Sequence, residues 1–140
     1  MVAGVGGSVS IVAQSMAMSE ATDQMALIEF AARFAERVPE LARLVHVPNG
    51  EHRAKGTAGR LKAMGVRAGY PDLLLDVPRG GYHGLRIELK AGKGRTSDAQ
   101  TEWIAFLRAA GYAVQVCYGW PAAAIVILDY LGADPKEFGL

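Results

Sequence analysis

The sequence predicts an α/β fold in which a mixed β-sheet is flanked by helices. Segments with helical spacing of apolar residues alternate along the chain with short apolar runs that are typical of strands. Two of these runs, 72–77 and 84–90, are separated by Arg79-Gly80-Gly81, a turn signal that favours a β-hairpin. The chain has 140 residues, of which 51% are hydrophobic, and this is enough for one ordinary globular core.

The N-terminal part of the chain predicts a helix over residues 20–37. Ser19 is a candidate N-cap, acidic residues follow it in the first turn, and Pro39 would stop the helix. The residues before this helix are rich in glycine, serine and other small side chains, which favours a flexible segment. We therefore expect a flexible N-terminal segment over 1–18 and a single domain over 19–140.

The middle of the chain predicts a short strand, a short helix and then the hairpin. The short strand covers 44–47, and the helix covers 54–64 and ends at Gly65. Within the hairpin, 72–77 is apolar at its centre, whereas 84–90 alternates between apolar and polar residues.

A helix, a strand and a last helix complete the predicted order. The amphipathic helix over 97–110 follows a loop, 91–96, that is rich in glycine and basic residues. The strand over 112–118 is apolar enough to be buried on both faces, and we expect Cys117 within it to be a buried, unreactive thiol. A proline in the first turn opens the helix over 121–131.

Basic residues concentrate in the middle of the chain, although the formal net charge is only +1. Residues 52–95 contain ten Lys or Arg against three Asp or Glu. Such a local excess indicates either a phosphate-binding face or an ordinary solvated surface. No apolar stretch reaches the roughly 18 residues of a membrane span, and the N-terminus lacks the basic start of a signal peptide. We therefore expect a cytoplasmic protein that makes no membrane contact.

Several kinds of site are disfavoured by spacing. His46, His52 and His83 do not have the spacing of a zinc site, and the single cysteine excludes a cysteine-based one. The glycine-rich loop 91–96 lacks the spacing of a nucleotide-binding P-loop.

A polar face on the second hairpin strand carries the candidate chemistry. Because strand side chains alternate, Arg86, Glu88 and Lys90 share one face, opposite the apolar residues between them. If 72–77 and 84–90 pair as a hairpin, Asp72 lies opposite the C-terminal part of the second strand. Asp72, Glu88 and Lys90 then converge. The alternative is a half-exposed strand with an ordinary polar face.

Two carboxylates beside a lysine suit the hydrolysis of a phosphodiester. Mg²⁺ takes one or two protein carboxylates and fills its remaining positions with water and phosphate oxygens. The ion polarises the phosphoryl oxygen and lowers the pKa of a bound water, and a lysine can neutralise developing charge.

The ordered set of motifs resembles the VRR-NUC family of PD-(D/E)xK nucleases, especially its short stand-alone phage and prophage members. The motifs are Gly69-Tyr70-Pro71-Asp72, then Ile87-Glu88-Leu89-Lys90, then Ser97-x-x-Gln100 with Trp103. The resemblance extends over about 20–131. It implies a restriction-endonuclease-like fold, dependence on Mg²⁺ with Mn²⁺ as a substitute, and cleavage of DNA. It also implies kinship with Holliday-junction resolvases, which act as homodimers on branched DNA.

The resemblance also assigns roles to residues. Asp72 and Glu88 would be metal ligands, Lys90 would activate water, and a glutamate of the first helix would complete the set. Glu20 fits that position best and Glu29 is its rival; either could instead be a surface acid. Gln100 would touch the site, although Ser97-x-x-Gln100 is also the pattern of a helix capping box, and both interpretations can hold.

Candidate DNA-backbone contacts come from the basic segment. They are Arg53, Lys55, Arg60, Lys62, Lys93 and Arg95. Tyr70 and Tyr82 could stack on bases, but packing within the protein is the better interpretation. No base-reading motif is present, so recognition of DNA shape or backbone is expected. The alternative function is a non-catalytic nucleic-acid-binding module on the same fold, which the complete set of Asp72, Glu88 and Lys90 disfavours.

Overall fold

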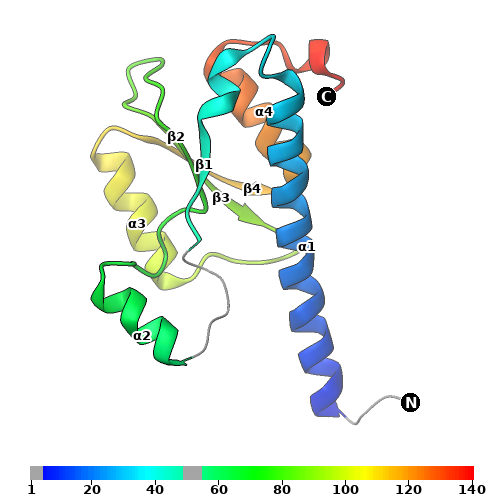
Figure 1. Ribbon diagram of the computed structural model, residues 1–140, viewed down its shortest axis with the longest axis vertical. Coiled ribbons are helices and arrows are strands. Elements are labelled where there is room, and N and C mark those ends of the chain that lie inside the picture. The colour runs from blue at the N-terminus through cyan, green and yellow to red at the C-terminus, as the bar shows by residue number, and fades with distance from the viewer. Residues whose placement is uncertain (1–4, 49–54) are drawn as a thin grey trace. The chain divides into compact units, whose positions relative to one another are not determined.

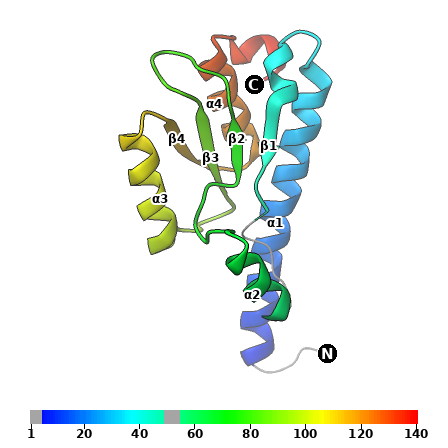
Figure 2. The ribbon, with the colours of Figure 1, turned by 60° about the vertical axis from the view of Figure 1, so that its left-hand side comes forward.

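The computed structural model describes residues 5–48 and 55–140, with the side chains of 5–19 and of Lys55 left out. Its centre is a four-stranded sheet with the strand order β1-β2-β3-β4 (Figure 2). The strands are β1 (Leu44–His46), β2 (Leu73–Leu75), β3 (Leu85–Lys90) and β4 (Ala113–Tyr118).

The sheet is mixed, as the sequence predicts. β1 pairs antiparallel with β2, and β2 pairs antiparallel with β3. β4 runs parallel to β3, because the Ala113 amide bonds the Gly84 carbonyl at one end and the Gly119 amide bonds the Lys90 carbonyl at the other. The expected α/β class is therefore confirmed.

Helices precede, connect and follow the strands (Figure 1). They are α1 (Val5–Phe34), α2 (Lys55–Ala63), α3 (Asp98–Ala109) and α4 (Trp120–Leu131), with short 3-10 helices at Pro39–Arg43 and Pro135–Phe138. The predictions for α2, α3 and α4 are confirmed to within one or two residues. None of the helices in the described part of the chain is long and apolar enough to cross a membrane.

The first helix differs from its prediction at both ends. It begins at Val5, so Ser19 lies inside it and is not its N-cap. It ends at Phe34, where the amides of Arg37 and Val38 turn back to the Phe34 carbonyl, before Pro39 is reached. The residues before Ser19 contain no proline, and this lets the helix continue towards the N-terminus. The expected boundary between a flexible segment and a domain stays a prediction.

Strand β4 is also less buried than its apolar sequence predicts. Val114 and Cys117 are buried, but Gln115 and Tyr118 are exposed. The physical reason is the strand order, since β4 forms an edge of the sheet and edge strands are covered less completely. The expected buried thiol is confirmed, and burial raises the pKa of Cys117 from 9.0 to about 11.

The chain divides into two compact units. The first contains α1, α4 and the C-terminal turn, together with Leu89–Gly94. Within it, α1 packs beside α4 (Figure 1), and the Asp23 carboxylate accepts a hydrogen bond from the Trp120 amide at the start of α4. This carboxylate suits the positive end of the α4 helix dipole.

The second unit consists of Arg43–Glu88 and Arg95–Val116 and therefore holds most of the hairpin and α3. Its core combines Ile104 and Leu107 of α3 with Val114 of β4. The predicted hairpin turn is confirmed. Gly80 and Gly81 have φ of 56° and 86°, and the Arg79–Tyr82 bridge closes the two-residue loop that such angles allow.

Candidate active site

The hairpin register brings Asp72 next to Glu88. Leu73 pairs with Ile87 and Leu74 with Arg86, so one further step along both strands sets Asp72 opposite Glu88. Directly opposed residues of antiparallel strands point to the same face, with Cβ atoms about 5 Å apart. Two carboxylates at this separation are close enough to bind one ion between them.

The polar face of β3 is buried. Arg86, Glu88 and Lys90 are only 6%, 2% and 8% exposed, which is as little as many residues of the core. The half-exposed strand with an ordinary polar face is therefore wrong. Burial of a charged group is costly unless other groups compensate it, so this face requires either partners or a function.

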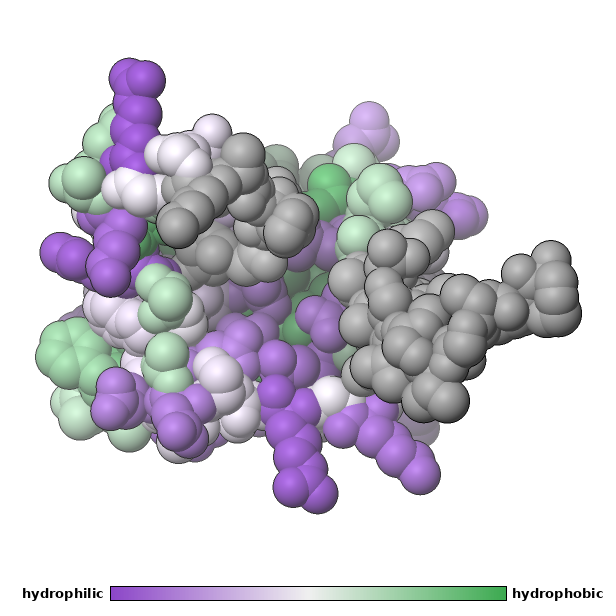
Figure 3. All heavy atoms as spheres, turned by 90° about the horizontal axis from the view of Figure 1, so that it is seen from below, coloured by the Kyte–Doolittle hydropathy of each residue, from purple (hydrophilic) through white to green (hydrophobic). Residues whose placement is uncertain are grey.

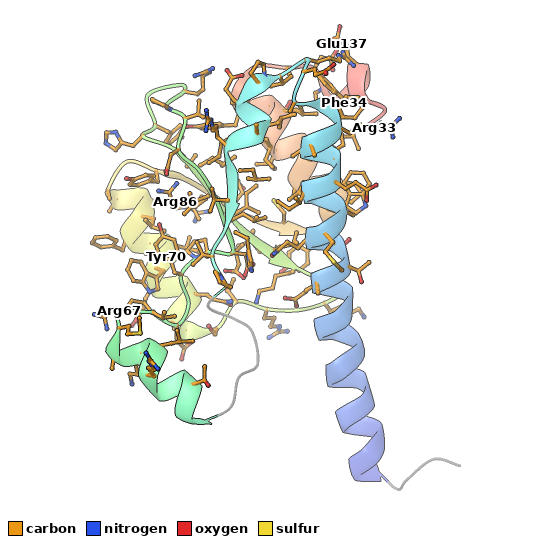
Figure 4. All side chains as sticks on the ribbon, in the orientation of Figure 1. Arg33, Phe34, Arg67, Tyr70, Arg86 and Glu137 are labelled. Atoms are coloured by element: carbon orange, nitrogen blue, oxygen red, sulfur yellow. The ribbon has the colours of Figure 1, made fainter. Side chains whose placement is uncertain are left out.

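Arg86 has a structural role on that face. Its guanidinium donates to the Tyr70 hydroxyl at 3.0 Å and pairs with Asp76 at 3.2 Å. It also lies 4.4 Å from the centre of the Tyr112 ring. These contacts compensate its charge and hold Tyr70, the residue two positions before Asp72, in place (Figure 4).

Gln100 connects the start of α3 to Glu88. Its side-chain oxygen accepts a hydrogen bond from the Ser97 backbone amide at 2.8 Å, and its backbone amide donates to the Ser97 hydroxyl at 3.2 Å. These two bonds form a capping box. The remaining group, Nε2, donates to Glu88 Oε2 at 3.1 Å. The capping box is therefore confirmed, and the same side chain contacts Glu88. A role of Gln100 in the active site stays a prediction.

Gly69 allows the segment before Asp72 to reach α3, a role that the sequence analysis missed. Its φ of 88° is accessible mainly to glycine, and an added Cβ would lie 2.5 Å from the Ala99 carbonyl carbon. The first turn of α3 therefore packs directly on the chain that leads to Asp72. The positive φ could not be read from sequence, although a glycine just before Tyr70-Pro71-Asp72 is the available signal.

The backbone of Asp72 is held from β1. The Val47 amide donates to the Asp72 carbonyl at 2.7 Å, and His46 Nδ1 lies 2.9 Å from the same oxygen. Because a carbonyl only accepts, His46 Nδ1 carries the proton in this bond. The spacing of His46 in the sequence speaks only against a zinc site, so this positioning contact is not predicted from sequence.

Lys90 follows Glu88 on the same face of the same strand, by alternation. The chain then turns sharply, and the Gly94 amide bonds the Ala91 carbonyl at 3.1 Å. A Cβ on Gly94 would lie 3.5 Å from the Lys90 side chain, so the turn packs on the lysine stem.

The other predicted site residues are distributed over several elements. Glu20 is half-buried on α1 and Glu29 is exposed on it, and the metal-binding role of either stays a prediction. Four of the predicted DNA contacts are exposed, namely Arg60, Lys62, Lys93 and Arg95. Arg53 and the Lys55 side chain lie outside the described residues. The face in Figure 3 carries many projecting hydrophilic side chains.

The donor set fits a hard divalent cation with few protein ligands. Among the side chains that the structure describes, no group of three His, Cys, Asp or Glu residues could hold a metal ion. The assembled set is the pair Asp72 and Glu88, and Mg²⁺ is commonly held by one or two carboxylates. An oxygen-only pair without histidine or thiol does not suit zinc.

The family follows from comparison with known proteins. The family model for the VRR-NUC domain matches residues 19–121, which is most of the chain. The chain belongs to the VRR-NUC family. A solved structure described as a VRR_NUC domain protein matches with a TM-score of 0.68 and 33% sequence identity, and the match covers 83% of this chain and 91% of that chain. A search of curated proteins finds no match.

Family membership confirms the resemblance inferred from the motifs. The matched region of this VRR-NUC chain contains Asp72, Glu88, Lys90 and Gln100. The domain is thus of the nuclease type. The phage origin suggested by the resemblance stays a prediction.

Proposed function

We propose that this VRR-NUC domain is a Mg²⁺-dependent DNA endonuclease with Asp72, Glu88 and Lys90 as its catalytic centre. The observation that carries the proposal is the hairpin register, which opposes Asp72 to Glu88 on a buried polar face. Gln100 supports it, because its hydrogen bond to Glu88 fixes the orientation of that carboxylate.

Asp72 and Glu88 would hold the cation, and Mn²⁺ would substitute for Mg²⁺. When bound, Mg²⁺ supplies a polarised phosphoryl oxygen and a water of lowered pKa. The protein contributes the fixed positions of the two carboxylates. Capping of α3 and the β1 contacts to the Asp72 backbone maintain these positions before any substrate arrives.

Lys90 would hold the attacking water and stabilise negative charge that develops on the phosphate. It lies on β3 one alternation beyond Glu88, so its side chain leaves the strand on the same face as that of Glu88. Its short following turn packs on the lysine stem, which limits how far the side chain can swing.

The proposed substrate is DNA, recognised by its backbone and shape. Arg60, Lys62, Lys93 and Arg95 are exposed cations that could contact phosphates. The described part of the chain offers a mixed sheet and helices but no helix-turn-helix, so direct base reading is not expected. We further propose that a homodimer presents two sites, because concerted cleavage of two strands of a branched junction needs two.

A cleavage assay tests the central proposal. Supercoiled plasmid and a four-way junction are incubated with the protein in Mg²⁺, in Mn²⁺ or in EDTA. Cleavage in both metals and none in EDTA is expected. Metal-independent binding of the DNA without any cut would instead favour the non-catalytic binding module.

Assembly and electrostatics are tested separately. Light scattering at micromolar concentration should give the mass of a dimer, and a strict monomer that cuts both junction strands symmetrically would contradict the paired-site proposal. DNA affinity should fall as the salt concentration rises. In a plot of the logarithm of the association constant against the logarithm of the salt concentration, each neutralised phosphate adds about −0.9 to the slope.

A further inference from the structure

A hollow beside Asp72 is not explained by metal binding. It has a volume of ≈ 460 Å³, and its lining includes Val47, Leu61, Val66, Arg67, Tyr70 and Trp103. We call it the Tyr70–Trp103 pocket. All of these residues belong to the same compact unit as Asp72 and Glu88. The volume is within the range of about 300–1,000 Å³ that is typical of small-molecule pockets.

The register places this pocket on the carboxylate side of the sheet. Val47 bonds the Asp72 carbonyl and is therefore the cross-strand neighbour of Asp72 on the side of β1. The row Val47, Asp72, Glu88 thus runs across three strands on one face, with neighbouring Cβ atoms about 5 Å apart. One wall of the pocket is consequently the immediate neighbour of a proposed metal ligand.

The walls of the pocket are aromatic and held in place. Tyr70 and Trp103 contact edge to face, with ring centres 5.0 Å apart. The Tyr70 hydroxyl is held by Arg86, and the close approach of Gly69 to Ala99 fixes the chain before it. Both aromatic rings are only half-buried although they pack against the Ile104–Leu107–Val114 core. A flat apolar group could therefore meet preformed aromatic surfaces.

One cation lines the pocket, and two more flank a lining residue in sequence. Arg67 lies in the lining, next to Tyr70 in Figure 4, and Leu61 comes between the exposed Arg60 and Lys62 at the end of α2. The described lining contains no acidic residue. Apolar walls together with the Arg67 cation match the chemistry of a nucleotide, which has a flat base and a charged phosphate.

We propose that the Tyr70–Trp103 pocket receives one unpaired nucleobase of the DNA strand beside the proposed cleavage site. The substrate class is therefore DNA with an unpaired nucleotide at a branch or fork. Rotating a base out of intact duplex costs energy, whereas a base that is already unpaired enters without that cost. Among the described lining residues Arg67 alone is charged, and stacking is therefore expected to dominate over base-edge recognition, so that all four bases are accepted.

The position of the base relative to a cut rests on the proposed nuclease function, but occupation of the pocket can be measured without cleavage. The probe is a forked DNA whose single-stranded arms carry one abasic site, moved nucleotide by nucleotide away from the branch. Affinities are measured by fluorescence anisotropy in EDTA. For the wild-type protein, loss of the base at one position should weaken binding by about 5- to 150-fold, the range for one aromatic stack.

Filling the pocket with a larger side chain should abolish the loss of affinity that the abasic site causes, which we call the abasic penalty. Leu61→Trp and Val66→Phe add bulk inside the lining, whereas Met64→Trp adds the same indole at a position that is 70% exposed and outside the lining. In the two filled variants, intact and abasic forks should bind equally to within about twofold, the usual error of additivity. Met64→Trp should retain the wild-type penalty. Circular dichroism identifies any variant that does not fold, and Val66→Phe replaces Leu61→Trp in that case.

The proposal is overturned if the wild-type protein shows no position-specific abasic penalty, a result that needs no variant. It is equally overturned if the penalty persists in a folded, filled variant. Loss of dimer mass in Leu61→Trp with an unchanged abasic penalty would assign the pocket to a second copy of the chain. Cleavage of the intact fork in Mg²⁺ is recorded in parallel. A position-specific penalty without cleavage would reject the proposed nuclease function and keep the base pocket.

Discussion

The two faces of strand β3 are buried to the same extent but differ in chemistry. Leu85, Ile87 and Leu89 on one face are 1–2% exposed, and Arg86, Glu88 and Lys90 on the other are 2–8% exposed. The apolar face is explained by the core alone, because burial of apolar surface stabilises the fold. The polar face gains nothing from burial itself and must be maintained by specific contacts.

The polar face also differs along its length. Arg86 is held by Asp76, Tyr70 and Tyr112, which together account for its burial structurally. Glu88 instead receives a hydrogen bond from a capped helix start and is opposed to another carboxylate. Two opposed carboxylates repel each other unless a cation or a bound proton compensates their charge. Within one face, therefore, Arg86 has contacts that explain its burial, and Glu88 is the proposed metal ligand.

The largest expected effect is the removal of one carboxylate charge. Asp72→Asn or Glu88→Gln should lower the cleavage rate in Mg²⁺ by about 1,000-fold or more, since a metal ion supplies several kcal/mol of transition-state stabilisation. Both variants should fold normally, because each keeps a hydrogen-bond acceptor of the same shape. Single-turnover nicking and thermal unfolding test this, with the exposed Glu36→Gln as the matched control. Normal turnover in either variant would remove that residue from the centre.

Lys90 is expected to affect the rate rather than DNA binding. Lys90→Ala should lower the saturating single-turnover rate by about 100- to 1,000-fold, the range seen when one group that stabilises transition-state charge is removed. Lys93→Ala, three residues later and exposed, should weaken DNA affinity and leave the saturating rate near that of the wild type. If Lys90→Ala changes affinity alone, Lys90 contacts the DNA backbone and is not catalytic.

The two contacts of Gln100, with Ser97 in the capping box and with Glu88, can be tested separately. Gln100→Ala should lower cleavage about 10- to 100-fold, the usual cost of losing a residue that orients a metal ligand. Ser97→Ala disrupts the same capping box but leaves the bond from Gln100 to Glu88 in place. Both variants should lose about 1 kcal/mol of unfolding free energy, and Ser97→Ala should keep most of its activity. Equal rates in the two variants would show that Gln100 acts only through the helix.

A substitution on the apolar face of β3 should lower the stability of the protein and leave its cleavage rate unchanged. Ile87→Ala removes a side chain that is 1% exposed and should lower the free energy of unfolding by about 2–5 kcal/mol. Its cleavage rate per folded molecule should remain close to the wild-type value at a temperature below its melting transition. Denaturant unfolding measures the free energy of unfolding, and the nicking assay measures the cleavage rate. A rate loss as large as that of Glu88→Gln would show that the two faces of β3 do not differ in function.

The sequence predicts the local parts of this arrangement. Alternation along β3, the glycine turn and the pattern Ser97-x-x-Gln100 are short-range signals, and the structure shows the corresponding strand, hairpin and capping box. The hairpin prediction is enough to anticipate that Asp72 and Glu88 lie opposite one another.

The burial of the polar face of β3 and the positioning of Asp72 depend on tertiary contacts. Period-two alternation cannot show that the polar face of β3 is buried, because its cover comes from other elements. The close approach of Gly69 to Ala99 and the His46 bond to the Asp72 backbone also join residues far apart in sequence. The N-terminal extension of α1 is not predicted, because Ser19 is a favourable N-cap residue and glycine is tolerated in helices only at a cost.

Binding of Mn²⁺ in the absence of DNA tests the central claim most directly, namely that the opposed carboxylates hold a divalent cation. Titration calorimetry is performed on the wild-type protein and on Asp72→Asn, Glu88→Gln and Ile87→Ala. Saturable binding is expected for the wild-type protein and for Ile87→Ala, with loss of that binding in both carboxylate variants. Unchanged Mn²⁺ affinity in Asp72→Asn and Glu88→Gln, with both variants folded, would contradict it.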